Sequence, residues 1–265
     1  MQRNSLMRIF RVLMTMIACC SQTFVWAATE VNVEKAGTLS SLLTTTDSEL
    51  KLTGSINGTD VKYLRQLIND GKVTTLDISG VRIVSGGVAY YESNKTTADV
   101  IGEYMFKDCK KLRSVVLPTS ISTIARCAFQ YTNLRRVEIP DNVQRLGYGA
   151  FSDCSLLTTV VVGRKVSHIE QGTFYNSDVK TIFVKPTTPP TLDAYIFTTK
   201  PTIRVYSNVL ADYKESSWAQ YGSIVGLLEN FYPMEDNGSD TEQAARHVFQ
   251  RRRLHRTESG IPGNE

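Results

Sequence analysis

Few side chains in this 265-residue chain are spaced for covalent chemistry. A nucleophilic mechanism needs a thiol or hydroxyl beside a base, and the candidate pair is Cys154 with His168. The other two histidines, His247 and His255, lie near the C-terminus. The acidic residues are scattered, and no zinc spacing, phosphate-binding loop, dinucleotide fingerprint or nucleophile elbow is present. We therefore expect no enzyme activity, no cofactor and no metal site.

A unit of 22–23 residues, repeated four times, is the strongest pattern in the sequence. Each unit has a block that ends in phenylalanine: Ile101–Phe106, Ile124–Phe129, Leu146–Phe151 and Ile169–Phe174. An L-x-x-L-x-L block follows each phenylalanine: Leu112–Leu117, Leu134–Ile139, Leu157–Val162 and Val179–Val184. The alternation within the second block is typical of a short strand with one buried face.

A single unit of this size buries too few side chains to offset the conformational entropy of its backbone. Stacked units bury one another's faces, and their strands then align into a parallel sheet. The phenylalanine and leucine positions are interpreted as core. A thiol at the repeated position of Cys154 then faces the interior and packs as a small hydrophobic group. His168 is expected in a surface loop.

The repeat pattern I-x-x-x-A-F-x-x-C-x-x-L-x-x-V-x-L-P-x-x-V resembles the BspA-like leucine-rich repeats of surface proteins from anaerobic Gram-negative bacteria. Cys109 and Cys154 occupy the family's cysteine position, whereas Thr132 and Ser177 depart from it. The resemblance covers roughly residues 36–228. It implies a repeat solenoid of the α/β class, right-handed, with a parallel β-sheet and a cap at each end. It also implies adhesion to host matrix proteins or to other bacteria.

The chain divides into five predicted parts: a signal peptide at 1–28, an N-terminal cap at 29–99, four repeats at 100–190, a C-terminal cap at 191–229 and a basic tail at 230–265. In the first cap, Asp60 is expected to cap a helix that runs to Gly71, and Ser85–Asp99 is expected to form a loop. In the second cap, Val209–Tyr221 is expected to form a helix over the last repeat.

The N-terminal segment resembles an export signal. Three arginines precede a short apolar run at Val12–Ala18, and cleavage is expected after Ala27 or Ala28. A lipid anchor on Cys19 and a buried N-terminal helix are the alternatives. The run is shorter than the roughly 20 residues that cross a membrane, so no transmembrane span is expected in the mature chain. We therefore predict a secreted or cell-surface protein, exposed at the outer membrane.

The net charge of +4 falls to about +1 in the mature chain, because residues 1–28 hold three arginines and no acid. This balance argues against a nucleic-acid partner. The arginines of the tail, between Arg246 and Arg256, form either a patch for nucleic acid or an anionic surface or, as we favour, a solvated and mostly disordered tail. The three cysteines that remain, Cys109, Cys127 and Cys154, are expected to be free thiols because they form no close pair.

A ligand would bind where side chains point away from the core. In each predicted strand the residues flanking the buried ones face outward, and stacking arranges them in two columns. The first column contains Ser114, Arg136, Thr159 and Thr181, and the second contains Val116, Glu138, Val161 and Phe183. The second column is unusually apolar, which suits recognition but also agrees with plain β-propensity. The predicted function is an exported module that binds an extracellular protein or glycan; a structural envelope protein without a specific ligand is the alternative.

Overall fold

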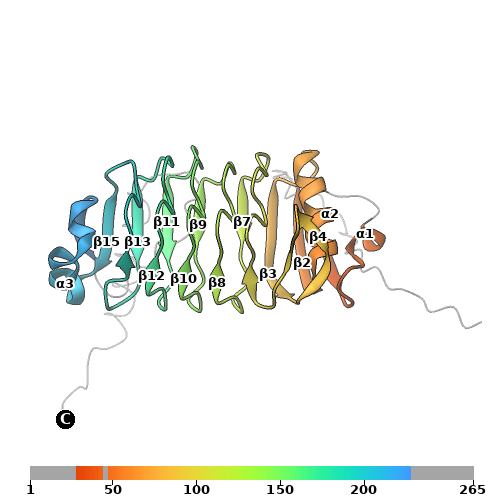
Figure 1. Cartoon of the computed structure of the whole chain (residues 1–265), viewed down its shortest axis with the longest axis horizontal. Helices are drawn as coiled ribbons and strands as arrows, with labels where there is room; N and C mark the ends of the chain where they lie inside the picture. Colours follow the sequence, from red (N-terminus) through yellow and green to blue (C-terminus); the bar gives the residue numbers. More distant parts are fainter. Residues whose placement is uncertain (1–27, 44–46, 228–265) are drawn as a thin grey trace, which may run out of the picture.

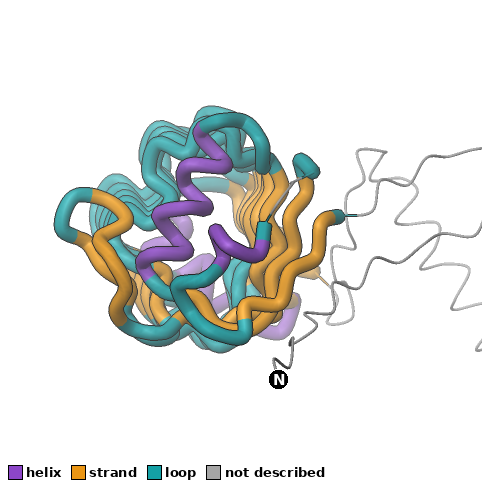
Figure 2. The backbone as a smooth tube through the Cα atoms, turned by 90° about the vertical axis from the view of Figure 1, so that its right-hand side faces the viewer, coloured by secondary structure: helices purple, strands orange, loops and turns teal. Residues whose placement is uncertain are grey.

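The computed structural model describes residues 28–43 and 47–227, and it confirms the predicted α/β repeat solenoid. Successive segments follow one another along the long axis of the molecule (Figure 1). Seen along that axis, the repeats superimpose as a closed stack with strands on two sides (Figure 2). The predicted signal peptide and the predicted basic tail lie outside the described residues. Within the described ranges, no helix is long and apolar enough to cross a membrane.

The longer strands run in parallel along one side of the solenoid, which we call the main sheet. One part contains β1 (Thr29–Val33), β2 (Glu49–Ile56), β3 (Thr75–Ile83) and β7 (Ser114–Val116). The other part contains β9 (Arg136–Glu138), β11 (Thr159–Val162), β13 (Thr181–Val184), β15 (Thr202–Tyr206) and β16 (Ser223–Leu227). The two parts are adjacent, since β7 lies beside β9 and the Arg135 amide donates to the Arg113 carbonyl oxygen at 3.4 Å.

A second parallel sheet contains strands of only two residues, one from each repeat. They are β6 (Val100–Ile101), β8 (Thr123–Ile124), β10 (Arg145–Leu146), β12 (His168–Ile169) and β14 (Thr191–Leu192). In each strand the second residue is the more buried one. His168 therefore belongs to a strand, and the prediction that it lies in a loop is wrong, because a two-residue strand is too short to show an alternating pattern.

A stack of phenylalanine rings runs through the core between the two sheets. Neighbouring rings in the series Phe106, Phe129, Phe151, Phe174 and Phe197 have centroids 5.2–5.6 Å apart and lie nearly parallel. The fifth ring, Phe197, lies outside the four units counted from the sequence. The stacking therefore continues into the segment that was assigned to the C-terminal cap.

The turns around the phenylalanines hold the repeats together through their backbones. Tyr104, Cys127 and Tyr195 have φ angles of 57°, 50° and 57°, at positions where other repeats have glycine. Left-handed backbone of this kind is unfavourable for a side chain and persists only when its surroundings fix it. Here the phenylalanine amides donate to the next repeat, for example Phe129 to Ala150 at 2.8 Å and Phe151 to Thr173 at 2.8 Å. These bonds between repeats fix the turn.

The positions at which Thr132 and Ser177 replace the cysteine of the pattern form a buried polar column beside the rings. The Thr132 hydroxyl donates to the Phe129 carbonyl oxygen at 2.9 Å, and the Cys154 thiol donates to the same oxygen at 3.1 Å. The Ser177 hydroxyl accepts from the Cys154 amide and donates to the Phe151 carbonyl oxygen. Thiol and hydroxyl thus serve the same purpose, because both satisfy turn carbonyls that are shielded from water.

The N-terminal cap differs from its predicted outline in two ways. Its helix α2 spans Gly58–Asn69 and is capped by Asn57, whereas Asp60 is the third helical residue. The buried Asp60 carboxylate accepts from the amides of Gly37, Leu39 and Asn57, and so ties the helix to the segment that leads into α1 (Leu39–Leu42). Helix and segment are joined by a carboxylate rather than by apolar contact alone.

The predicted loop at Ser85–Asp99 is instead a hairpin of β4 (Gly86–Tyr91) and β5 (Asn94–Thr96), packed against α2. Gly58 permits this contact, because a Cβ there would meet the Val88 carbonyl oxygen. Such close backbone approach does not follow from a polar composition, which is why the segment resembles a loop in the sequence.

The C-terminal cap covers the last repeat as predicted, but not with one helix. A turn at Ser207–Val209 precedes α3 (Leu210–Glu215), and a second short turn follows at Ser217–Gln220. The Ser216 hydroxyl accepts from the Trp218 amide and so caps the start of the second turn. Tyr213 and Trp218 are fully buried and donate to the carbonyl oxygens of Pro186 and Pro190.

Because the phenylalanine stack joins successive repeats, Phe151→Ala should lower the free energy of unfolding by about 3–5 kcal/mol. Denaturant unfolding followed by circular dichroism measures this loss. The exposed Tyr175 provides the control, since Tyr175→Ala should change stability by less than about 0.5 kcal/mol. Equal losses for the two variants would contradict the role of the stack.

Burial raises the pKa of both the Cys109 and the Cys154 thiol to about 11. Unfolded thiols ionise near pH 8.5. Between these values the native state retains protons that the unfolded state loses, so the free energy of unfolding should fall as pH rises from about 8.5 to 11. In the Cys154→Ser variant the free energy of unfolding, measured by denaturant unfolding across this pH range, should fall less steeply. An unchanged slope would be evidence against a contribution from the Cys154 thiol.

Candidate functional site

The first outward column on the main sheet is polar and continuous. Arg136, Thr159 and Thr181 are aligned in register on β9, β11 and β13, and Ser114 holds the same position on β7. The register extends the column to Thr202 and Ser223 at one end and to Thr75 at the other. All of these residues are exposed or half-buried. The structure therefore places the four predicted residues together on the surface.

The second column is less uniform than its sequence suggests. Val116 is 48% exposed, Glu138 is exposed and Phe183 is half-buried. Val161, which stands between Glu138 and Phe183 in the register, is only 1% exposed. The prediction that Val161 is exposed is therefore wrong.

Lys185 gives the physical reason why Val161 is covered. This residue follows β13, and its ammonium group reaches Glu138 on β9 at 2.8 Å and Asp141 at 3.7 Å. The ion pair therefore crosses β11, which lies between the two strands. The aliphatic stem of a lysine can cover apolar surface while its charge is paired. Replacing Val161 would consequently disturb packing as well as any binding surface.

Arg204 extends the second column beyond the predicted residues. It is aligned in register with Phe183, and its guanidinium carbon lies 5.6 Å from the centre of the Phe183 ring. The Arg204 Nε is buried and has no hydrogen-bond partner among the described residues. A half-buried arginine beside an aromatic ring is suited to an anionic or carbonyl group of a ligand, although the Nε itself is shielded from such a contact. The residue escaped prediction because its strand was assigned to the cap.

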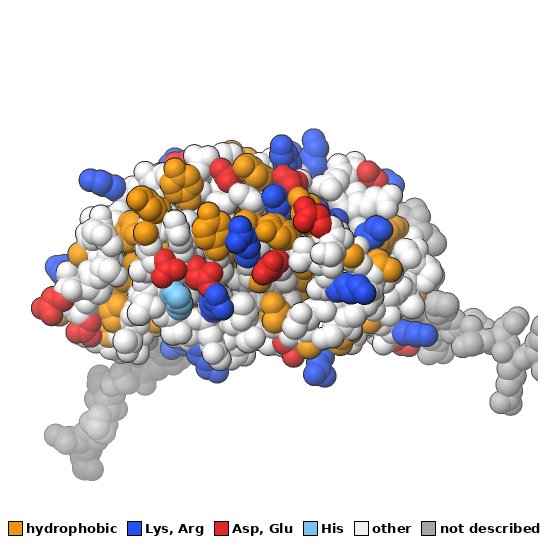
Figure 3. Space-filling view, in the orientation of Figure 1, with side chains coloured by type: hydrophobic (Ala, Val, Ile, Leu, Met, Phe, Trp, Pro, Cys, Tyr) orange, Lys and Arg blue, Asp and Glu red, His pale blue; other side chains and the backbone are white. Residues whose placement is uncertain are grey.

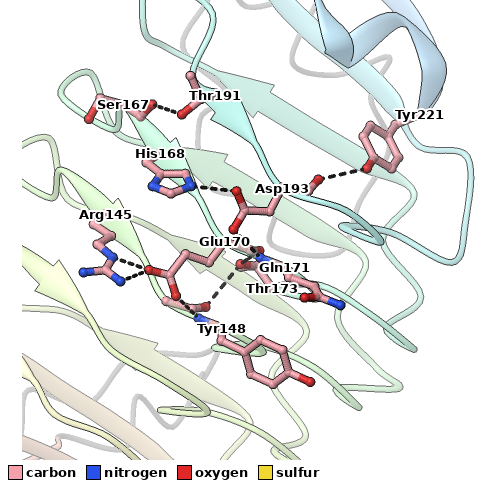
Figure 4. A network of polar contacts seen from close by, with 11 residues as sticks. Arg145, Tyr148, Ser167, His168, Glu170, Gln171, Thr173, Thr191, Asp193 and Tyr221 are labelled. Carbon is pink, nitrogen blue, oxygen red and sulfur yellow. Dashed lines mark hydrogen bonds and ion pairs between the residues drawn. The ribbon is translucent and has the colours of Figure 1, made fainter.

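The second sheet carries a polar network that sequence reasoning did not anticipate (Figure 4). Arg145 forms an ion pair with Glu170, and His168 Nε2 lies 3.0 Å from an Asp193 carboxylate oxygen. Each carboxylate also accepts a backbone amide of the preceding repeat, from Tyr148 and Gln171 respectively. The hydrogen bond from His168 lowers the pKa of Asp193. Each of these contacts links a residue of one repeat to a carboxylate of the next, so the network joins successive repeats.

Exposed tyrosines lie in the turns next to this network: Tyr131, Tyr148, Tyr175 and Tyr195. On this face of the molecule, hydrophobic side chains gather beside the acidic groups and the histidine (Figure 3). The Arg126 guanidinium lies 4.8 Å from the centre of the Tyr148 ring. Their positions close to the repeated phenylalanines are visible in the sequence. They lie in turns, however, and do not show the alternating pattern by which outward residues of a strand are recognised.

The candidate nucleophile pair, Cys154 with His168, is not assembled. Cys154 is fully buried, and its contacts are with Thr132, Ser177 and backbone carbonyl oxygens, whereas His168 contacts Asp193. Its raised thiol pKa further disfavours the reactive thiolate. All three cysteines in the described ranges are buried free thiols. No group of three metal-ligating side chains occurs among the described residues.

Comparison with solved structures finds matches of low sequence identity. The pneumococcal vaccine antigen PcpA is 16% identical over 69% of this chain, with a TM-score of 0.38, and this chain spans 55% of its length. A leucine-rich repeat protein of T. pallidum is 18% identical over 87% of this chain and 80% of its own, with a TM-score of 0.34. A leucine-rich cell surface protein of Faecalibacterium prausnitzii is 16% identical over 68% of this chain and 67% of its own, with a TM-score of 0.31. No curated protein matches the chain.

A family model provides the firmer assignment. The BspA type leucine rich repeat region matches residues 92–204 in six copies. This range includes the phenylalanine stack from Phe106 to Phe197 and the strands from β7 to β13. The resemblance inferred from the repeat pattern is thereby confirmed. Residues 92–204 of this chain belong to the BspA-type leucine-rich repeat family, a family of repeat scaffolds rather than of known enzymes.

Proposed function

We propose that the chain is an exported binding module without enzymatic activity, which recognises an extracellular protein or glycan through the main sheet. The observation that carries the proposal is the pair Phe183–Arg204, a half-buried aromatic ring and a half-buried cation aligned on rigid neighbouring strands. The hydroxyl groups of Thr181 and Thr202, on the same two strands, add polar contacts beside it, and Val116 adds an exposed apolar side chain three strands away on β7. Rigid strands lose little entropy on binding, which favours recognition at such a surface.

Export places this surface outside the cell, where host matrix proteins and other bacteria are the proposed partners. The basic segment, the apolar run and the Val25–Ala27 site support cleavage of the signal peptide. The family assignment fits a surface or binding role. No step of the proposed function requires a cofactor.

Binding can be tested with the mature chain on arrays of matrix proteins and glycans. For a ligand found there, Phe183→Ser combined with Arg204→Gln should weaken binding tenfold or more, equivalent to about 1.4 kcal/mol. The matched control is Tyr148→Ser combined with Arg126→Gln, which removes a similar cation–aromatic pair beside the second sheet. The control should bind normally. If only the control variant loses binding, the site lies at the exposed tyrosines instead. If no ligand binds on any array, the alternative of a structural envelope protein is favoured.

Export has a separate test. The protein recovered from its native cells should begin near Ala28 or Thr29 when its N-terminus is sequenced. Intact Met1 in a cytosolic fraction would refute export, whereas lipid attached to Cys19 would establish the anchored alternative.

A further inference from the structure

Five cations gather where the chain enters β7 and β9: Lys110, Lys111, Arg113, Arg135 and Arg136. We call them the basic edge. Four are exposed and Arg136 is half-buried. Lys and Arg side chains project from the upper border of the molecule in Figure 3, the border where Figure 1 shows the loops that lead into these strands.

None of the five side chains forms an ion pair or a hydrogen bond within the described ranges. Later repeats pair their cations instead, as in Lys180 with Asp178 at 3.3 Å and Lys185 with Glu138 at 2.8 Å. Asp108 is the acidic residue nearest before the basic edge, and Glu138, just after it, is occupied by Lys185. Within residues 108–138 the five cations therefore outnumber the acidic residues, which are Asp108 and Glu138.

The backbone holds these charges in a fixed array. The Arg135 amide donates to the Arg113 carbonyl oxygen, so the two arginines lie on adjacent repeats, about 4.8 Å apart along the solenoid. Between the cations, Leu112 and Leu134 are fully buried. The basic edge is therefore polar throughout, with the hydroxyls of Ser114 and Thr159 beside Arg136.

We propose that the basic edge binds an anionic polysaccharide through its sulfate or carboxylate groups. Guanidinium groups pair with such groups through two parallel hydrogen bonds, and a row of cations gains further by releasing counterions from a dense polyanion. A protein partner would normally bury an apolar or aromatic anchor at the centre of its contact, and the basic edge offers none. The inference rests on the proposed export and binding function and names one ligand class for it.

The test uses the full mature chain with heparin and chemically desulfated heparin as probes. The variant Lys111→Gln, Arg113→Gln, Arg135→Gln should bind heparin at least tenfold more weakly, and its salt dependence should decrease by about two charges. The variant Arg251→Gln, Arg252→Gln, Arg253→Gln removes three charges from the tail, outside the described residues, and should lose less than threefold. Arg113→Lys with Arg135→Lys keeps the charge and should retain most of the binding if only charge matters, or lose it if paired hydrogen bonds contribute.

Retained affinity for desulfated heparin would assign the ligand group to carboxylates, and its loss would assign it to sulfates; both results support the proposal. Heparin binding within twofold of the unmodified chain, or equal losses for the basic-edge and tail variants, would overturn it. Thermal unfolding of each variant verifies the fold. A negative result with heparin would not contradict binding at the Phe183–Arg204 site, because that site is tested with its own variant and ligand.

Discussion

The structure depends on contact between neighbouring repeats. One repeat cannot hide its phenylalanine ring, satisfy its turn carbonyls or support its left-handed residues; the next repeat does all three. Cys127 illustrates the point, since it keeps a φ of 50° where another repeat has Gly149, and its amide donates to the Tyr148 carbonyl oxygen of the following repeat. The chain therefore folds as a stack, and each end of the stack needs a cap.

This dependence explains which features could be predicted from sequence. Repeated apolar positions predict the core, because the same side chain recurs wherever the same neighbours recur, and Phe106 to Phe174 and the strand leucines are all buried as expected. The caps are less regular, so only their presence and buried residues such as Tyr213 and Trp218 could be inferred. The hairpin at 86–96 depends on close backbone approach at Gly58, which a single sequence does not reveal.

The candidate site was predictable only in outline, for a related reason. The period of a strand assigns Val161 to the outward face, but its exposure depends on Lys185, which reaches across β11 from the next repeat. Arg204 is placed by its contact with the Phe183 ring on the neighbouring strand, and His168 is placed by its hydrogen bond to Asp193 in the following repeat. Such contacts join residues 21–47 positions apart at variable positions, where a repeat pattern carries no information.

Those variable positions are where function can differ between proteins that share this scaffold. The inward residues are constrained on both sides by neighbouring repeats, so substitutions there cost stability, whereas outward residues are constrained only by their lateral contacts. In this chain the second sheet uses its outward charges to join repeats, since Arg145–Glu170 and His168–Asp193 pair internally. Among the residues that the structure describes, the cations at the entry to β7 and β9 form no such pair, and charge left unpaired on a rigid array is available to a partner.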